Sequence, residues 1–470
     1  MAPVAPTGKA GHQQLRVYHR RWLYMAIACV QQFVQMQYFV TFAPVADATD
    51  AYYGDGTNDT LSAIFMAGAL LATVPAMYVC RRHGLRVVLL IGNTVMAVGL
   101  LVRSTSSIDG LSQATRYWLV LSGHAVCALT NPFTMMLPPK VAQVWFGDTQ
   151  RALCTSIVAA TGTVGIMYMS LLAPFVVPTQ HADRPEQRMP LLNWISLAPA
   201  IVAAILAIAF ARESTPPLPP SRSATVRTPF WSGLIGCFKS IPFIILFLVV
   251  GMGVGLFNTV YVMLEQVLCI NGYTDQFAAL CLVLIIVGGL IGATVGGVAA
   301  DKTGYFNELL KIEFSIVTIS LSVMSITSMY AGQQVALAIV STVFGAAGLA
   351  SYAMAFEVAV ECTYPIEETT SAGLLGFSGQ LWGLMLVLMF TATARPLTGP
   401  ETQREICRVG GAISPDNYSL AMLLASSAGV LGTAIALTLF KPDYRRQKVE
   451  RVHAIAHAIP ADTTRDSYDQ

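Results

Sequence analysis

Charged side chains are scarce in this chain of 470 residues. Asp, Glu, Lys and Arg make up 11% of it, whereas a soluble domain carries about 25%. Hydrophobic residues make up 54%, so most of the chain must face lipid or pack inside a helical bundle. This composition excludes a soluble globular protein, and we expect no nucleic-acid partner.

Motifs of catalysis and of metal binding are also missing. The chain contains no G-x-S-x-G, no H-E-x-x-H and no phosphate-binding loop. Its nine cysteines are spread out, without a C-x-x-C pair or a zinc spacing. We therefore expect no enzymatic activity, no cofactor and no metal. No signal peptide is evident, because the first 18 residues are polar and no cleavage site follows early.

Long apolar segments dominate the chain instead. A bilayer core about 30 Å thick requires roughly 20 apolar residues per helix. Twelve segments meet this requirement, with centres near Phe33, Ala69, Val95, Leu129, Gly162, Ala203, Val254, Ile286, Leu321, Ala346, Leu384 and Val430. The predicted fold class is an all-α membrane protein with twelve transmembrane helices.

The second half of the chain repeats the layout of the first. Gly84 lies in the basic turn C-R-R-H-G-L-R and Gly304 in the turn A-D-K-T-G-Y-F, 220 positions apart. Trp145 and Tyr364 each end a long apolar run, 219 positions apart. Matching hydropathy in two halves is typical of secondary transporters, whose substrate site lies at the midplane between them. We predict two pseudo-symmetric halves of six helices each.

The repeat also sets the predicted domain boundaries. These are a cytoplasmic tail (1–19), the first six-helix half (20–211), a cytoplasmic linker (212–240), the second half (241–440) and a basic cytoplasmic tail (441–470). The linker is rich in Pro, Ser and Arg and lacks periodicity. The basic strip 441–448 is expected to bind anionic lipids of the inner leaflet.

The basic residues predict the orientation. Of 28 Lys and Arg residues, 21 lie in the termini or the even-numbered loops, which places these parts in the cytoplasm. We expect the plasma membrane, with an endosomal or lysosomal membrane as the alternative. The sequons at Asn58 and Asn417 fall in outside loops and could carry glycans. Cys269 and Cys407 also fall outside and could form a disulfide.

Polar side chains inside apolar helices are candidates for substrate contacts, because they cost free energy unless they meet a partner or a cavity. Helix 1 carries Gln31, Gln35 and Tyr38 on one face, which suggests a cavity wall, with contacts between helices as the alternative. The predicted substrate-binding residues are Gln35, Tyr38, His124, Asn131, Asn258, Tyr261 and Gln380.

Acidic residues near the helix ends are candidates for gates. Asp47 and Glu265 lie near the outer ends of helices 1 and 7. Burial would favour the neutral form of Glu265, which could then carry a coupled proton or hold a cationic substrate; the alternative is an outer-gate hydrogen bond or a solvated carboxylate. Glu357 and Glu361, one turn apart near the inner end of helix 10, are predicted to brace an inner gate through Lys or Arg partners.

Three stretches carry a family resemblance: N-P-F-T-M-M-L-P-P-K-V-A-Q-V-W-F (131–146), A-F-E-V-A-V-E-C-T-Y-P (355–365) and K-P-D-Y-R-R-Q-K (441–448). With them, the chain resembles the feline leukaemia virus subgroup C receptor-related transporters, solute carrier family 49 of the major facilitator superfamily. Two further stretches, T-F-A-P-V-A-D (41–47) and M-L-E-Q-V-L-C (263–269), are most similar to its "major facilitator domain-containing" branch. The resemblance covers residues 20–450 and implies alternating access.

The resemblance also bears on the substrate. It implies haem or porphyrin, choline or ethanolamine, or a vitamin-like molecule. The choline-carrying members hold the quaternary ammonium between two aromatic residues, and Gln35 and Asn258 align with those positions here. Without both rings, cation binding loses about 1–4 kcal/mol, which puts choline in doubt. Asn131 and Gln380 keep two polar pocket positions.

We therefore predict a transporter of a small organic solute. Haem or a porphyrin is the first expectation, on family grounds, and choline, ethanolamine or a vitamin-like solute is the alternative. A membrane receptor that binds without transport is the hypothesis from another class, and the short tails disfavour it.

Overall fold

The computed structural model describes residues 18–147, 150–178, 185–217, 229–303, 305–364, 366, 368–396 and 416–442. Nearly all of this part is helical. The helices of the first half are α1 (Arg21–Phe39), α2 (Ala46–Tyr53), α3 (Thr57–Thr105), α4 (Gln113–Ala128), α5 (Asn131–Met135), α6 (Leu137–Trp145), α7 (Arg151–Val176) and α8 (Met189–Phe210), with short 3-10 turns η1 (Ala43–Val45) and η3 (Pro185–Arg188).

The second half repeats this arrangement. Its helices are α9 (Phe230–Cys237), α10 (Ile241–Cys269), α11 (Asp275–Thr303), α12 (Phe306–Thr327), α13 (Gln334–Thr363), α14 (Glu368–Thr393) and α15 (Ser419–Leu439). Two short strands, β1 (Arg395–Pro396) and β2 (Asp416–Asn417), pair antiparallel between α14 and α15. The fold class is therefore the predicted one, apart from this small ladder.

Nine helices of the described part are long and apolar enough to cross a membrane, or ten if a bent pair is counted as one span. Two features explain why this number is lower than the predicted twelve. Helix α3 has 49 residues and is interrupted at Gly84, whose φ of 75° is not helical. Helix α1 carries four glutamines and is not among the nine. The count of twelve stays a prediction.

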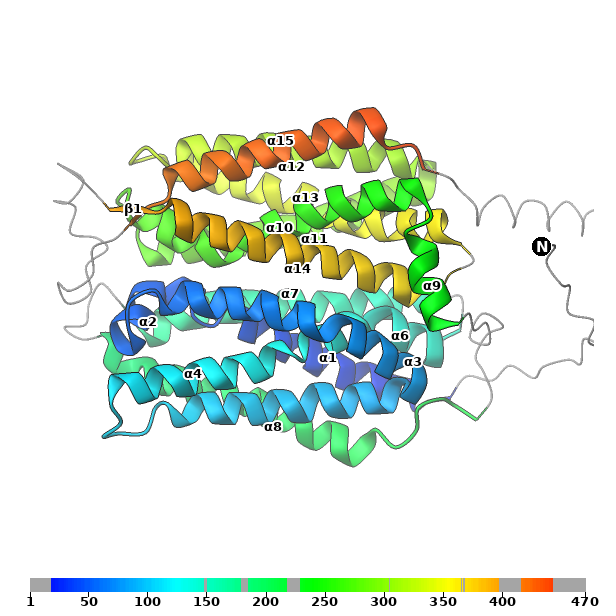
Figure 1. The fold of residues 1–470 in the computed structure, drawn as a ribbon, viewed down its shortest axis with the longest axis horizontal. Coiled ribbons are helices and arrows are strands. Elements are labelled where there is room, and N and C mark those ends of the chain that lie inside the picture. The colour runs from blue at the N-terminus through cyan, green and yellow to red at the C-terminus, as the bar shows by residue number, and fades with distance from the viewer. Residues whose placement is uncertain are drawn as a thin grey trace, which may run out of the picture.

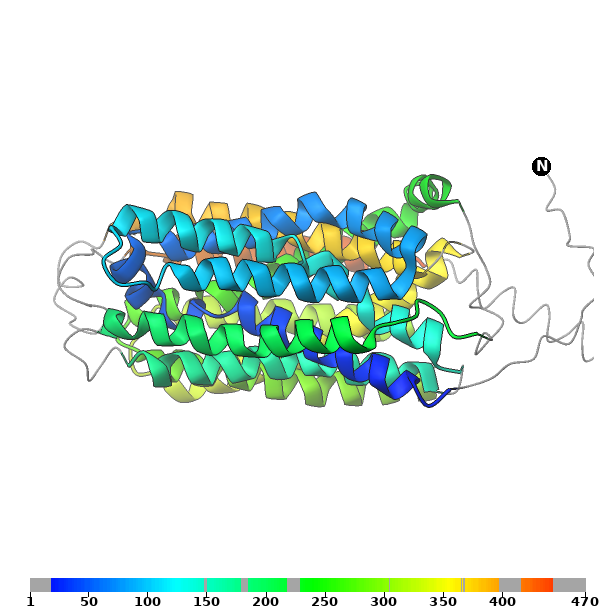
Figure 2. The same cartoon turned by 90° about the horizontal axis from the view of Figure 1, so that it is seen from below.

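The two halves form separate bundles that lie side by side (Figures 1 and 2). Helix α14 packs against α3, and α11 against α7, so these pairs join the halves. We call the end where α1 begins the inner end and the end where α4 begins the outer end. These names follow the predicted orientation.

Glycines let the helices of the second half approach closely. A Cβ atom on Gly345 of α13 would lie 1.8 Å from the carbonyl oxygen of Ile285 on α11. One on Gly251 of α10 would lie 1.9 Å from the hydroxyl oxygen of Ser378 on α14. Small residues at crossings of membrane helices allow this close backbone approach. Close packing is thus the role of these two glycines.

The predicted linker contains a helix. Helix α9 lies across the inner end of the bundle, at an angle to the long helices (Figure 1). Its Phe230 ring packs edge-on against Tyr78 of α3 at 5.8 Å, and its Gly236 lies beside Ile366. The predicted linker over 212–240 thus includes a helix at 230–237, where an apolar stretch follows the Pro- and Ser-rich part, and its role as a linker stays a prediction.

Candidate functional site

A broken helix shapes the space between the halves. The fourth apolar segment is divided into α4, α5 and α6, and the axis bends by 42° between residues 113–135 and 137–145. Prolines cause this break, because they remove backbone donors and clash with the preceding turn. Pro132 is the second residue of α5 and Pro138 the second residue of α6. Discontinuous helices near the midplane often form the binding sites of transporters.

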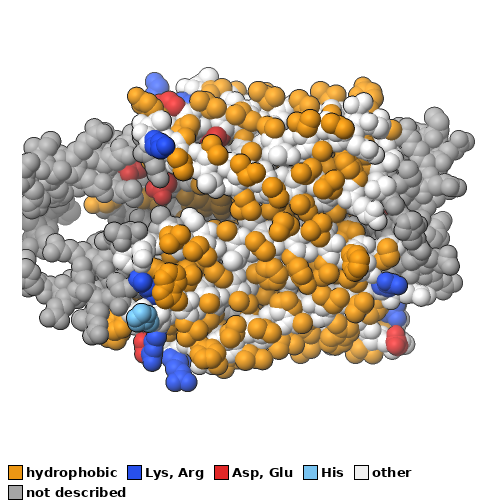
Figure 3. All heavy atoms as spheres, turned by 180° about the vertical axis from the view of Figure 1, so that it is seen from behind, with side chains coloured by type: hydrophobic (Ala, Val, Ile, Leu, Met, Phe, Trp, Pro, Cys, Tyr) orange, Lys and Arg blue, Asp and Glu red, His pale blue; other side chains and the backbone are white. Residues whose placement is uncertain are grey.

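A cavity lies against this break. It has about 470 Å3 of empty space, including the part that is open to solvent. We call it the central cavity. It is lined by both halves: Ala69, Thr73, Asn131, Pro132, Met135, Met136, Pro139, Tyr352, Phe356, Thr369, Ala372, Gly373, Gly376, Phe377 and Gln380. In Figure 3 the surface is hollowed between the halves toward the inner end, which lies on the left in that view.

Two amide groups from opposite halves line this cavity. Asn131 of α5 is 1% exposed and Gln380 of α14 is 2% exposed. The amide oxygens of both residues are buried and have no hydrogen-bond partner among the described residues. A buried acceptor without a partner costs about 1–3 kcal/mol, so these two oxygens favour a ligand that donates hydrogen bonds.

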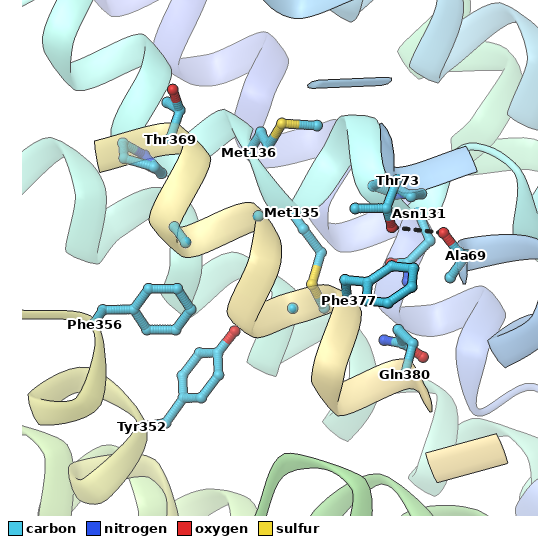
Figure 4. A pocket seen from close by; sticks show the side chains of 15 residues that line it. Ala69, Thr73, Asn131, Met135, Met136, Tyr352, Phe356, Thr369, Phe377 and Gln380 are labelled. Atoms are coloured by element: carbon cyan, nitrogen blue, oxygen red, sulfur yellow. Dashed lines mark hydrogen bonds between the residues drawn. The ribbon is translucent and has the colours of Figure 1, made fainter. Parts of the chain in front are cut away.

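Aromatic rings form another part of the wall. Tyr352 and Phe356 reach the cavity from α13, and Phe377 lies on α14 in the same region as Asn131 and Gln380 (Figure 4). No Asp, Glu, Lys, Arg or His is among the lining residues. These rings could not be predicted from the sequence, because aromatic residues in apolar helices give no signal that separates a cavity wall from a packed core.

Three predicted substrate residues lie inside the first half instead. The hydroxyl of Thr130 donates to Gln35 Oε1 at 2.8 Å. The hydroxyl of Tyr38 donates to the carbonyl oxygen of His124 at 2.6 Å, and the two rings lie 4.5 Å apart. None of the three lines the central cavity. The spacing in helix 1 identified one face correctly, but that face is turned into the first half.

The predicted residues of helix 7 also lie away from the cavity. Tyr261 is 4% exposed and packs edge-on against Phe257 at 5.0 Å. Asn258 is half-buried and does not line the central cavity. Of the seven residues predicted to bind substrate, the structure thus brings Asn131 and Gln380 together at the central cavity.

A buried arginine was missed by the sequence analysis. Arg103, near the outer end of α3, is fully buried and donates to the hydroxyl of Ser196 on α8. Its guanidinium lies 4.9 Å from the ring centre of Phe42 and 5.9 Å from that of Tyr38. Such contacts stabilise a desolvated cation by about 2 kcal/mol. Arg103 thus fixes Phe42, which precedes the segment η1 at the outer closure.

Polar contacts between the halves close the outer end. The side-chain amide of Gln266 on α10 donates to Asp59 Oδ1 at 3.1 Å, and the hydroxyl of Thr391 on α14 donates to Asp59 Oδ2 at 3.4 Å. The carboxylates of Asp47 and Glu265 lie within 4.8 Å of each other. The structure therefore brings the two predicted gate residues together, and adds Asp59 to them.

Cys269 lies beside this carboxylate pair. It is disulfide-bonded, so its sulfur offers no thiolate to a metal ion. Cys407, the predicted partner, lies outside the described residues, and the predicted pairing stays a prediction.

The remaining predicted residues have different surroundings. Glu361 is 4% exposed, whereas Glu357, one turn earlier on α13, is exposed, and their predicted role at an inner gate stays a prediction. Asn58 is 2% exposed in the first turn of α3, so a glycan does not fit on its side chain in this conformation. Asn417 is half-buried, and its side-chain oxygen accepts from the backbone N–H of Ser419 at 2.8 Å. Most of the basic strip 441–448 lies outside the described residues.

Comparison with known proteins identifies the family. A family model described as the Major Facilitator Superfamily matches residues 22–387. The chain is 30% identical over 450 residues to solute carrier family 49 member A3 of Xenopus tropicalis, an alignment that covers 93% of this chain and 90% of that protein. The chain belongs to solute carrier family 49 of the major facilitator superfamily. The predicted family is confirmed.

Other relatives of this solute carrier agree with the assignment. The choline/ethanolamine transporter flvcr2a of Danio rerio is 24% identical, over 93% of this chain and 89% of that protein. The crystal structure of a D-xylose-proton symporter superposes with a TM-score of 0.68 at 12% identity, over 90% of this chain and 98% of that chain. That likeness concerns the fold alone. The protein is thus a multi-pass membrane protein and a secondary transporter, not an enzyme.

Proposed function

We propose that this transporter carries a small organic amine of the ethanolamine type through the central cavity. The observation that carries the proposal is the pair of unpartnered amide oxygens, on Asn131 and Gln380, one from each half. A primary ammonium has three N–H donors and would donate hydrogen bonds to both oxygens, whereas a hydroxyl group would donate to one of them. The relatives named choline/ethanolamine transporters, such as that of Danio rerio, support the same class of substrate.

The rings of the cavity favour a cationic head group as well. A cation held over an aromatic face gains about 0.5–2 kcal/mol, and Tyr352, Phe356 and Phe377 supply such faces. Choline has a quaternary ammonium without N–H groups, so only its hydroxyl could donate, and one of the two amide oxygens would be left without a donor. We therefore place ethanolamine-type amines before choline.

Haem or a porphyrin has less support from the site than from the family resemblance. Haem carries two carboxylates, and no Lys, Arg or His lines the central cavity. His124, a conceivable iron ligand, lies in the first half against Tyr38. The amine is therefore the better match to this cavity.

The transport cycle follows from the closed outer end. We propose that the halves rock about the cavity, and that the contacts of Asp59 with Gln266 and Thr391 break when the outer end opens. The pair Asp47 and Glu265 is proposed to release or bind a proton in that step, since a half-buried and a buried carboxylate this close cannot both be ionised without cost. The inner end is proposed to face the cytoplasm.

Uptake into proteoliposomes tests the substrate. Labelled ethanolamine, choline and haem are compared on the same preparation, with empty liposomes as the control. We expect saturable uptake of ethanolamine, with choline weaker and haem at the level of empty liposomes. Saturable haem uptake without amine uptake would overturn the proposal.

The proton step has its own test. Glu265→Gln removes one titratable group at the outer end and keeps its size. We expect amine uptake by this variant to depend less on pH than wild-type uptake does between about 5 and about 8. Wild-type uptake at every pH in this range would contradict the role of Glu265.

A further inference from the structure

Glu313 is a buried carboxyl group in the second half that the proposed substrate path does not use. It lies on α12, seven residues after the helix begins at Phe306, so it is about 10 Å along the helix from the inner end. Its side chain is 8% exposed. An ionisable side chain at this depth is a functional candidate, because it is costly unless it serves a purpose.

Small residues on two neighbouring helices make room for this carboxyl group. A Cβ atom on Gly296 of α11 would lie 2.8 Å from Glu313 Oε1 and 3.1 Å from the Cβ of Ala350 on α13. Three helices therefore meet at the carboxyl group, and a larger side chain at position 296 would displace it. The glycine gives Glu313 a place inside the bundle rather than at the lipid surface.

The described surroundings offer no charge to balance a carboxylate here. Oε2 of Glu313 has no hydrogen-bond partner among the described residues. The Lys311 ammonium, on the same helix, donates to the carbonyl oxygen of Leu437 at 3.5 Å.

The helices packed against α12 bring no cation to this carboxyl group among the described side chains. Helix α15 carries no titratable group, and Lys302 of α11 and Glu357 of α13 are exposed. Glu361 of α13 is buried in the last turn of that helix, at the inner end. Tyr352 of α13 lines the central cavity, and Glu265 of α10 lies at the outer end. An unbalanced carboxylate buried in the membrane costs several kcal/mol. The neutral acid is therefore the form that fits this conformation.

We propose that Glu313 is a proton-binding site of the transport cycle. Its carboxylate takes up a proton from water at the inner end, forming an O–H bond, while the outer end is closed. The proton returns to water when α11, α12 and α13 repack and expose the carboxyl group. We call the space between Gly296 and Ala350 that holds the Glu313 carboxyl group the niche. Helix α13 links the niche to the central cavity, because Ala350 lies at the niche and Tyr352, two residues later, lines the cavity.

Infrared difference spectroscopy on a pH step tests the proposal without any substrate. The full-length protein in lipid is taken from pH about 5 to about 8, and the C=O stretch of protonated carboxyl groups is recorded. We expect Glu313→Gln to lose one component of this band and Glu313→Asp to shift it. Glu308→Gln, an exposed residue in the first turn of the same helix, is the matched control and should leave the band unchanged.

An unchanged band in folded Glu313→Gln would overturn the proposal, and a melting curve establishes that each variant is folded. Transport gives a second readout. If the wild type moves the amine faster at one pH than at another, the ratio of the two rates should move toward one in Glu313→Gln, and a wild-type ratio in that variant would also overturn the proposal. The infrared result holds whether or not the amine is transported, so failure of the proposed substrate and failure of the proton site are distinguishable.

Discussion

The amides Asn131 and Gln380 illustrate what single residues of this chain reveal in the sequence. Both stand out as polar groups in apolar helices, and the family resemblance aligns them with pocket positions. The structure places both at the central cavity. Tyr38 and Gln35 stand out equally, yet they point into the first half. The spacing of polar residues along a helix shows which face is polar but not which neighbour that face meets. The sequence therefore could not show which of the two pairs lines the cavity.

The niche of Glu313 and the burial of Arg103 were hidden from the sequence for a similar reason. Each is a single charged residue in an apolar segment, and its meaning depends on Gly296, Ala350 or Phe42 from other helices. We expect Arg103→Leu to destabilise the first half by about 2 kcal/mol or more, because Ser196 Oγ loses its donor and the rings of Phe42 and Tyr38 lose the cation. The Ser196 hydroxyl still donates to the carbonyl oxygen of Asn193. Thermal unfolding in detergent measures this. A variant with the Tm of the wild type would contradict the structural role of Arg103.

Asp50 makes a prediction about pH. Its carboxyl oxygens accept from the backbone N–H groups of Asn58 at 2.8 Å and Gly56 at 3.3 Å. Burial, reinforced by Asp59 and Asp47, nevertheless raises the pKa of Asp50 to about 7. The usual pKa is about 3.9, so the folded protein holds the extra proton between these values.

The stabilisation from that proton is complete below pH about 4 and is lost as the pH rises through about 7. We therefore expect the Tm to fall between pH about 5 and about 8, and to fall less in Asp50→Asn. Melting curves of both proteins across this range give the comparison. An equal fall in both would show that Asp50 does not hold the proton.

At the scale of helices, close packing at glycine determines how near α11 and α13 approach each other. We expect Gly345→Ala to destabilise the protein by about 1–3 kcal/mol, because the new methyl group meets the backbone carbonyl of Ile285, which cannot move aside. Gly297→Ala is the matched control, since nothing lies within 4 Å of its Cβ position. Melting curves of the two variants test this expectation, with a lower Tm expected for Gly345→Ala. Equal Tm values would contradict the role of Gly345 in packing.

The order of the helices could be predicted from the length of each apolar segment and from the repeat, because neither depends on how the helices pack. The break in α4–α5–α6 was only partly foreseeable. Pro132 was visible in the sequence, but the 42° bend depends on how α6 packs against α7. Helix α9 was missed because an eight-residue helix gives little periodicity and depends on Tyr78 of α3 for its place.

The whole molecule is held closed at its outer end by few polar contacts. Asp59 accepts from Gln266 and Thr391 of the opposite half. We expect Asp59→Ala to shift the population toward conformations with an open outer end, because both contacts are lost together. Spin-label distances between the outer ends of α3 and α10 would then lengthen. A distance distribution like that of the wild type would contradict this outer closure.

The division into two halves is the feature of the whole molecule that the sequence predicted best, because it rests on a repeat of 220 positions and not on any single contact. The choice of substrate could not be predicted in this way. It depends on which side chains of both halves meet across the central cavity, and Tyr352 and Phe377 had no signal of their own.

The central claim is that Asn131 and Gln380 bind the transported amine. Uptake of labelled ethanolamine by proteoliposomes tests it most directly, in the wild type, Asn131→Leu, Gln380→Leu and the control Asn258→Leu, an amide of α10 outside the cavity. Loss of a hydrogen bond to a charged group costs about 1.5–3 kcal/mol, so each of the first two variants should raise KM about tenfold or more, while the control should not. A wild-type KM in both cavity variants would contradict the account.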